Sequence, residues 1–260
     1  MRQAALVTGA GKRLGRAMAL YLARRGCDVA VHYATSRDAA EAVAAEARGH
    51  GVRAATVPAD LTDEAAMQAL VPGAAAALDT ELTVLVNNAS IFEYDSLASA
   101  TRASWDRHLE SNLRAPFVLT QGFAAQAPAP GRDQAGEPIA RALVVNLIDQ
   151  RVLKPTPEFM TYTIAKMGLW ALTRTAAQAL APAIRVNAIG PGPTLQGARQ
   201  SAAHFAAQRA ACLLERGAGP DDITAALGYF MDAPAVTGQL LCIDGGQHLA
   251  WQTPDVLGLE

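Results

Sequence analysis

Short apolar runs alternate along the chain with longer stretches in which apolar residues recur with a helical period. The first run, residues 4–8, leads into a glycine-rich turn and then into a stretch with Leu14, Met18 and Leu22 on one face, ending at Gly26. Strands that alternate with helices at this spacing are typical of a parallel sheet with right-handed crossovers. The pattern therefore predicts an α/β fold, a doubly wound parallel sheet of about seven strands with helices on both faces.

The same alternation continues through the rest of the chain. We predict further strands at 28–33, 52–57, 82–86, 142–147, 184–189 and 240–243. We predict helices at 38–48, 64–78, 103–126 and 220–231, and a long one that opens within 149–166 and continues through 180. The proline-containing segment 128–138 is interpreted as an exposed excursion, too short for an interdomain linker. Residues 1–260 then form one domain, with a substrate lid near 193–216, where the pattern over 195–216 is helical.

Composition narrows the classes of function. A 51% hydrophobic content with 18% charged residues is typical of a globular domain, and a net charge of −2 without a basic run argues against nucleic-acid binding. No run predicts a membrane span or a signal peptide. Three cysteines without disulfide or metal spacing, and five scattered histidines, favour a reducing, cytoplasmic setting and predict no metal site.

The stretch 149–166 carries the strongest candidate chemistry. Tyr162 and Lys166 are four residues apart on the predicted helix, so their side chains leave the same face. A phenol titrates near ~10, and a neighbouring ammonium favours its phenolate form. Asp149 ends the preceding strand, where a loop can bring it beside the phenol. The alternative is a packed tyrosine beside a solvated lysine, but only three of the 22 Lys and Arg residues are lysines, which indicates that a compact ammonium is wanted here.

The turn after the first strand is a candidate dinucleotide site. A strand, a glycine-rich turn and a helix offer unpaired N–H groups and a positive dipole end to a pyrophosphate. We therefore assign five residues of the turn to cofactor binding: Gly9, Lys12, Arg13, Leu14 and Gly15. The alternative is a tight turn without a ligand.

The end of the second strand favours NADPH over NADH. NAD-binding units place an acid here, but in this chain the first acid, Asp38, already lies in the next helix. A guanidinium suits a 2′-phosphate, so His32, Tyr33, Ser36 and Arg37 are assigned to the cofactor. The alternative for Arg37 is a solvated residue in the first helical turn.

Polar residues also follow the other predicted strands. Ligands of doubly wound sheets bind outside the carboxyl ends of the strands. We assign eight further residues at these ends to the cofactor: Asp60, Leu61, Asn88, Ala89, Ser90, Pro191, Gly192 and Thr194. Asn112 lies in an apolar stretch of the predicted helix 103–126, and a buried amide there needs backbone or water partners.

Six sequence elements span nearly the whole chain and together resemble the short-chain dehydrogenase/reductase family: TGAGKRLG, NNAS, Asn112, YTIAK, the PG turn and IDGG. The resemblance implies a Rossmann fold and, commonly in this family, a homotetramer formed by the helices at 103–126 and 156–180 and the C-terminal tail. Three features are similar to the pteridine reductase branch of the family: Arg13 in place of the usual third glycine, Asp149 in place of the usual serine, and NNAS-x-F with Phe92. Bacterial dihydromonapterin reductases share several of these features.

The resemblance also implies residue roles. Tyr162 delivers a proton, with Asp149 as its partner, while Lys166 holds the nicotinamide ribose and lowers the pKa of the phenol. Asn112 positions the water of a proton relay. A carboxylic acid can protonate a ring nitrogen as hydride reaches the adjacent carbon, whereas serine only hydrogen-bonds a carbonyl. The implied substrate contacts are Arg13, Ser90, Phe92, Asp149 and Tyr162, with Phe92 stacking on the pterin and Arg13 contacting both a phosphate oxygen and the pterin.

Some positions depart from the branch. Residues 34–37 are not its His-Arg-Ser run, Phe159 replaces a frequent tyrosine, Gln150 and Arg151 add bulk and charge beside Asp149, and 193–216 matches no pattern. Three functions remain open: an NADPH-dependent reductase of dihydrobiopterin, dihydromonapterin or dihydrofolate; a reductase of 3-oxoacyl or sugar carbonyls, in which Asp149 is only a capping or loop acid; and a non-catalytic NADPH or pterin sensor. The intact Asn112, Tyr162 and Lys166 set argues against the sensor.

Overall fold

A single seven-stranded sheet runs through the molecule. The computed structural model describes residues 3–197 and 199–252. Its strand order is β3-β2-β1-β4-β7-β8-β9, and every neighbouring pair is parallel. The strands are β1 (Ala4–Val7), β2 (Asp28–Tyr33), β3 (Ala54–Pro58), β4 (Val84–Asn87), β7 (Ala142–Leu147), β8 (Ile184–Pro191) and β9 (Leu240–Ile243). The predicted doubly wound parallel sheet is confirmed.

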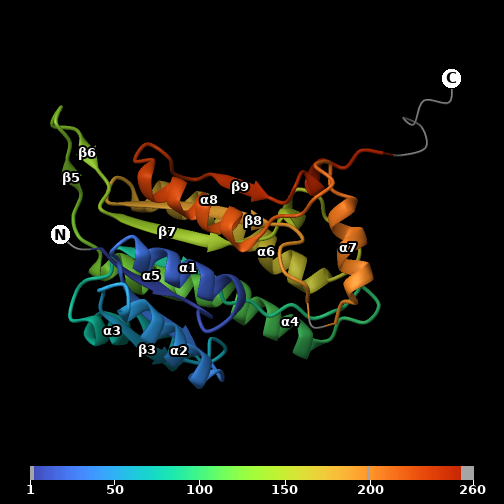
Figure 1. The fold of residues 1–260 in the computed structure, drawn as a ribbon, viewed down its shortest axis with the longest axis horizontal. Helices are drawn as coiled ribbons and strands as arrows, with labels where there is room; N and C mark the ends of the chain where they lie inside the picture. The colour runs from blue at the N-terminus through green and yellow to red at the C-terminus, as the bar shows by residue number, and fades with distance from the viewer. Residues whose placement is uncertain (1–2, 198, 253–260) are drawn as a thin grey trace.

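Helices cover both faces of this sheet (Figure 1). On one face α1, α2 and α8 pack together and share a core with the strands; on the other face α3, α5 and α6 do so. The helices are α1 (Arg13–Arg24), α2 (Arg37–Arg48), α3 (Glu64–Leu78), α4 (Arg102–Leu109), α5 (Ala115–Gln126), α6 (Met160–Leu180), α7 (Ala202–Ala210) and α8 (Pro220–Asp232). All residues of β1, β4 and β7 are buried, which explains their continuous apolar runs.

The structure corrects three predicted elements. The helix predicted over 103–126 is divided into α4 and α5 by a π-helical turn, η1 (Glu110–Arg114). The long helix begins only at Met160, after a 3-10 turn, η2 (Gln150–Val152), because the prolines between them disfavour helical backbone. In the lid segment only α7 is helical, and Ala198 lies outside the described residues.

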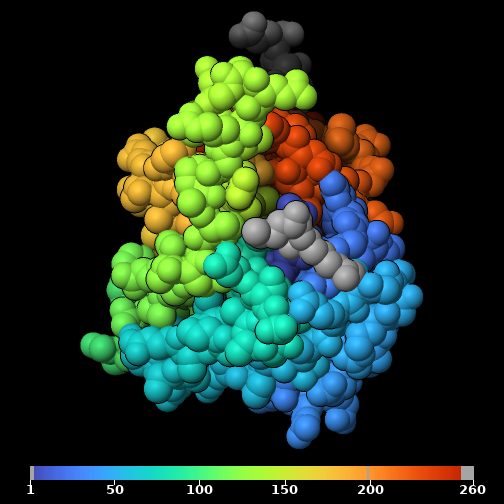
Figure 2. Space-filling view, turned by 90° about the vertical axis from the view of Figure 1, so that its left-hand side faces the viewer, coloured from blue at the N-terminus to red at the C-terminus, as the bar shows by residue number. Residues whose placement is uncertain are grey.

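The carboxyl ends of the strands face the side of the molecule where α7 lies, and a hairpin lies on the opposite side (Figure 1). There the predicted excursion forms the two short strands β5 (Gly131–Arg132) and β6 (Pro138–Ile139), and Figure 2 shows this yellow-green hairpin standing out from that face. A cavity of about 520 Å³ on this side is lined by Gln3, Thr83 and Arg185 among others, and contains none of the predicted site residues.

Several expectations concern properties beyond the fold. Within residues 3–197 and 199–252, no helix is long and apolar enough to cross a membrane. In the same part of the chain no three His, Cys, Asp or Glu side chains are grouped to hold a metal ion. Cys212 and Cys242 are free thiols, and Cys27 is buried. The homotetramer and the cytoplasmic location stay predictions, and residues 253–260 of the C-terminal tail lie outside the described residues.

Candidate active site

Asp149 and Tyr162 meet at the carboxyl end of β7. Asp149 follows this strand and caps η2, with its Oδ1 accepting a hydrogen bond from the Arg151 N–H at 2.8 Å. Tyr162 lies in the first turn of α6, is 5% exposed, and donates its hydroxyl proton to Asp149 Oδ2 at 2.9 Å. The predicted proximity of the acid and the phenol is therefore confirmed, and one proton lies between their two oxygens.

Lys166 lies beside Asp149 and Tyr162 and completes this group of side chains. Its Nζ donates to the Leu147 carbonyl at 2.8 Å and lies 5.7 Å from the centre of the Tyr162 ring. Burial, together with the charge of Asp149 and the hydrogen bond to it, raises the pKa of Tyr162 well above its ordinary value. The net shift is therefore upward, and a lowering influence of Lys166 on this pKa stays a prediction. Burial also lowers the pKa of Lys166 to about 8 and raises the pKa of Asp149.

Asn112 holds the loop after β4. Its side chain is fully buried in η1, where Oδ1 accepts from the Ile91 N–H and Nδ2 donates to the Ile91 carbonyl, both at 2.8 Å. The π-helical turn places the amide at this point, which satisfies the buried polar group as predicted. The structure gives Asn112 the task of fixing the residue before Phe92, and its role toward a relay water stays a prediction.

The glycine-rich turn forms a close-packed cradle at the end of β1. Gly9 has a φ of +60°, a conformation that favours glycine. A Cβ on Gly15 would lie 2.2 Å from the Gly9 carbonyl oxygen and 2.6 Å from Asn88 Nδ2, so a side chain is excluded there. α1 begins after Lys12 without a side-chain cap, which leaves the N–H groups of its first turn for a ligand. Leu14 packs partly against the core beneath the turn.

Arg13 takes the place of the third glycine in both conformation and position. Its φ of +54° is in the left-handed region, and its exposed guanidinium donates to the Leu195 carbonyl at 3.0 Å and the Gln196 carbonyl at 2.8 Å. Arg13 therefore ties the glycine-rich turn to the segment that the sequence predicts to be a substrate lid. Its contacts with a phosphate and a pterin stay predictions.

His32 corrects the list of cofactor ligands. The side chain is 1% exposed, its Nδ1 accepts from the Gly9 N–H at 2.9 Å, and its Nε2 lies 3.1 Å from the Ala59 carbonyl, to which it donates in the neutral tautomer. Both ring nitrogens are thus used to join the ends of β1, β2 and β3. The imidazole supports the Gly9 turn from behind and is not free to bind the cofactor.

The burial of His32 predicts acid sensitivity. Burial lowers the pKa of His32 from 6.5 to about 4. Between these values the unfolded chain binds a proton that the native state does not, so the free energy of unfolding falls by roughly 3 kcal/mol as the pH drops through this range. Urea denaturation of wild type and His32→Gln across this range is the measurement. The variant lacks this titration, so it should show the shallower slope; equal slopes would contradict the account.

The residues assigned to the 2′-phosphate lie at the start of α2. Arg37 is exposed in its first turn, Ser36 is half-buried at the N-cap without a side-chain cap, and Tyr33 is largely buried. The uncapped helix start presents N–H groups beside the Arg37 guanidinium. An anion fits this combination.

The carboxyl ends of β1 and β4 are joined by hydrogen bonds. The Thr8 hydroxyl oxygen accepts hydrogen bonds from the N–H groups of Asn88 and Ala89, both at 2.9 Å. Thr8 is part of the sequence motif TGAGKRLG, but the motif alone does not indicate this role. Asn88 Nδ2 donates to the Thr8 carbonyl at 2.8 Å. Ser90 is exposed, and its hydroxyl donates to the Ile91 carbonyl at 3.4 Å. These contacts bring the NNAS loop against the glycine turn.

The remaining assigned residues lie on the same side of the sheet. Asp60 is exposed after β3, and its carboxylate accepts from the Thr62 hydroxyl and N–H, which lowers its pKa; Leu61 beside it is buried. After β8, Pro191 is half-buried and a Cβ on Gly192 would lie 2.5 Å from Asp244 Cβ. The buried Thr194 donates from Oγ1 to the Gly192 carbonyl at 3.1 Å. Cofactor contacts by these residues stay predictions.

Phe92 belongs to an aromatic group beside Tyr162. Its ring stacks on Phe159, with centroids 4.3 Å apart and planes 12° apart, and meets the Tyr162 ring edge-on at 4.7 Å. The Arg151 guanidinium lies 5.3 Å from the centre of the Phe159 ring. Phe92 remains 45% exposed, so stacking on a substrate stays a prediction for this exposed part.

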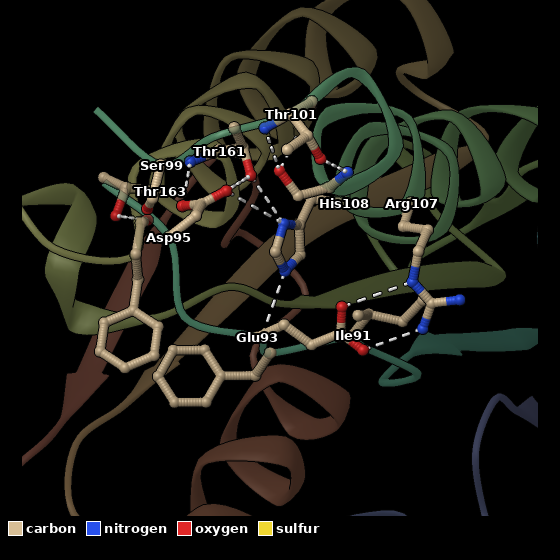
Figure 3. Close-up of polar contacts among 12 residues, drawn as sticks. Ile91, Glu93, Asp95, Ser99, Thr101, Arg107, His108, Thr161 and Thr163 are labelled. Carbon is tan, nitrogen blue, oxygen red and sulfur yellow. Dashed lines mark hydrogen bonds and ion pairs between the residues drawn. The ribbon is translucent and has the colours of Figure 1, made fainter. Parts of the chain in front are cut away.

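Three buried polar side chains near Tyr162 were missed in the sequence. Asp95, His108 and Thr161 are each at most 2% exposed and form one hydrogen-bonded cluster (Figure 3). Two positions in the sequence could have drawn attention to these side chains: His108 lies one helical turn before Asn112, and Thr161 directly precedes Tyr162. Neither motif predicts a bond between segments that are 53 and 66 residues apart.

A family model described as short chain dehydrogenase matches residues 3–206. The chain belongs to the short-chain dehydrogenase/reductase family. Among curated family members, 3-oxoacyl-[acyl-carrier-protein] reductase FabG of Staphylococcus aureus (strain Mu50) is 30% identical over 254 residues, which cover 96% of this chain and 99% of that protein.

Two solved structures of the family give a more detailed comparison. FolM alternative dihydrofolate reductase 1 from Brucella suis, in complex with NADP, is 41% identical with a TM-score of 0.90, covering 98% of both chains. The landomycin C-6 ketoreductase LanV, with bound NADP and rabelomycin, is 29% identical with a TM-score of 0.82, covering 95% of this chain and 96% of that one. One of these relatives is thus named for reducing a dihydrofolate and the other for reducing a ketone.

Proposed function

We propose that this protein is an NADPH-dependent reductase of a dihydropterin, such as dihydrobiopterin, dihydromonapterin or dihydrofolate. The observation that carries the proposal is the hydrogen bond of 2.9 Å between the Tyr162 hydroxyl and Asp149 Oδ2. Burial raises the pKa of Asp149, which favours its protonated form, and the hydrogen bond to Tyr162 lets the pair pass that proton to a substrate. The similarity to the FolM structure supports the same substrate class.

The residues at the sheet edge fit NADPH. Gly9 and Gly15 let the turn pack closely, and the uncapped start of α1 leaves backbone N–H groups that suit a pyrophosphate. The uncapped start of α2 and Arg37 suit the 2′-phosphate. Lys166, buried beside Tyr162, is placed to hold the nicotinamide ribose. The NADP complexes of the FolM and LanV structures support this cofactor.

The proposed chemistry reduces one C=N bond of the pterin ring. The bound cofactor supplies a hydride to the ring carbon. The Tyr162–Asp149 pair supplies the proton to the adjacent nitrogen, so the ring gains one C–H and one N–H bond. Asp149 is partly exposed, and the pair regains its proton from solvent after each turnover. Phe92 supports the flat ring, and Asn112 keeps Ile91 and therefore Phe92 in place.

A carbonyl reductase is the second candidate, favoured by the identity with FabG. Under this alternative Asp149 serves only as the cap of η2, where it accepts from the Arg151 N–H. The proton then comes from Tyr162 alone.

Substrate preference separates the two candidates. With the purified protein, we expect NADPH absorbance at 340 nm to fall with 7,8-dihydrobiopterin or dihydrofolate, and to stay constant with simple ketones. A 3-oxoacyl thioester should give a kcat/KM at least about tenfold lower, because it has no flat ring to stack on Phe92 and no ring nitrogen to accept the proton. Faster turnover of the thioester would reject the dihydropterin proposal in favour of the carbonyl reductase. Tight NADPH binding without turnover of either substrate would reject both.

A further inference from the structure

The cluster of Asp95, Thr161 and His108 joins the loop after β4 to the start of α6. Thr161 donates from its hydroxyl to Asp95 Oδ2 and from its N–H to Asp95 Oδ1 at 3.1 Å. The Asp95 carbonyl accepts from the Phe159 N–H at 2.8 Å. Burial raises the pKa of Asp95, but the hydrogen bonds from Thr161, together with Ser104 and His108, hold this pKa below its usual range, so Asp95 is a carboxylate.

His108 extends the cluster to α4 with one defined tautomer (Figure 3). Because the Thr161 hydroxyl gives its hydrogen to Asp95, His108 Nδ1 donates to Thr161 Oγ1 at 2.7 Å. Its Nε2 is then the acceptor of the Glu93 N–H at 3.2 Å. Burial lowers the pKa of His108, which keeps the ring neutral as this pattern requires. Every bond in the cluster therefore has one donor and one acceptor.

The cluster fixes the residues on both sides of the candidate site. Phe92 lies between Ile91, held by Asn112, and Glu93, held by His108. On the other side, the Asp95 carbonyl holds Phe159, which has a φ of +56°. These anchors account for the stacking of Phe92 on Phe159 and for the 4.7 Å between the Phe92 and Tyr162 rings.

We propose that Asp95, Thr161 and His108 are positioning residues that lock the Phe92 loop to the first turn of α6. They hold the Tyr162 hydroxyl and the Phe92 ring at a fixed separation during hydride and proton transfer. A directional polar network suits this task better than apolar packing, because its bonds define one orientation and a broken one leaves a buried group unpaired. The kinetic part of the inference rests on the proposed dihydropterin reduction.

Thr161→Val tests the lock, because it removes the hydroxyl and keeps the volume and the N–H. With 7,8-dihydrobiopterin we expect kcat to fall about 10- to 100-fold, the scale of a small misplacement of reacting groups, while the Kd of NADPH changes less than about twofold. Thr161→Ser restores the hydroxyl and should bring kcat to within about threefold of wild type. A Val variant within twofold of wild type, or a Ser variant as slow as Val, would overturn the proposal.

Two His108 variants separate its hydrogen bond to Thr161 from its hydrogen bond to the Glu93 N–H. They also test the proposal if the valine variant does not fold. His108→Asn keeps a donor near the Nδ1 position, facing Thr161, and His108→Gln keeps an acceptor near the Nε2 position, facing Glu93. We expect the asparagine variant mainly to raise KM through the loosened Phe92 loop. We expect the glutamine variant mainly to lower kcat. The reverse split, or two variants within twofold of wild type in both constants, would contradict the assignment.

Amide hydrogen exchange tests the lock without any substrate. In the folded Thr161→Val protein, residues 91–96 and 159–162 should exchange faster together, because the hydroxyl that links the two segments is lost. Faster exchange at 159–162 alone would show that the segments are not coupled and would overturn the proposal. If wild type fails to reduce dihydropterins, the proposed function fails, and this exchange result still decides the inference.

Discussion

Replacement of Asp149 by serine is expected to lower kcat for a dihydropterin by about 100- to 1000-fold, the range of a lost general acid. Serine keeps a hydroxyl near Tyr162 but cannot share an acidic proton with it. The glycine turn and the start of α2 do not involve Asp149, so the Kd of NADPH should change less than about twofold. Steady-state rates at 340 nm and fluorescence titration with NADPH measure the two quantities.

Asp149→Asn is the matched control for shape. Asparagine is isosteric and keeps one oxygen, which can still accept from the Arg151 N–H, but it places an NH2 group beside the Tyr162 hydroxyl and has no acidic proton. We expect it to be as slow as the serine variant. An asparagine variant with wild-type kcat would show that Asp149 has a structural role as the cap of η2.

A methyl group at Gly15 is expected to abolish cofactor binding, with the Kd of NADPH raised more than about 100-fold. The Cβ of Gly15→Ala would lie 2.2 Å from the Gly9 carbonyl oxygen and 2.6 Å from Asn88 Nδ2, so the turn itself must move. Its N–H groups then no longer face the pyrophosphate as a set. Fluorescence titration measures the Kd, and circular dichroism verifies that the variant is folded.

Gly73→Ala is the control for the substitution itself. Gly73 lies in α3 with no atom within 4 Å of a Cβ built on it. The alanine there should leave the Kd of NADPH unchanged and leave stability unchanged or raise it by up to ~1 kcal/mol. A folded Gly15→Ala protein that binds NADPH within threefold of wild type would contradict the proposed cradle.

Most of the architecture could be predicted from the sequence because β1, β4 and β7 are buried on both faces and appear as unbroken apolar runs. The proximity of Asp149 to Tyr162 could also be predicted, because both follow from strand–helix order at one edge of the sheet. The π-helical turn at Asn112 could not, since its apolar pattern continues smoothly from α4 into α5. The late start of α6 could have been predicted from the two prolines between η2 and α6, which disfavour helical backbone.

The pKa shifts and the long-range hydrogen bonds of the site could not be predicted from the sequence. The spacing of Tyr162 and Lys166 predicts a shared helix face, but the upward direction of the shift in the phenol's pKa is set by burial and by Asp149, which the spacing does not encode. His32 was assigned to the cofactor because of its place at a strand end, yet its ring turns inward to Gly9 and Ala59. The partners of Asp95 and His108 are set by the tertiary fold, so no local motif identifies them.

The central claim is that Asp149 and Tyr162 act together on a C=N bond, and one ratio tests it most directly. The kcat/KM for 7,8-dihydrobiopterin is divided by that for a 3-oxoacyl thioester, in wild type and in Asp149→Ser. The account predicts that the substitution lowers this ratio at least about 100-fold, because only the ring nitrogen needs the carboxylic acid. An unchanged ratio, with both substrates affected equally, would contradict it.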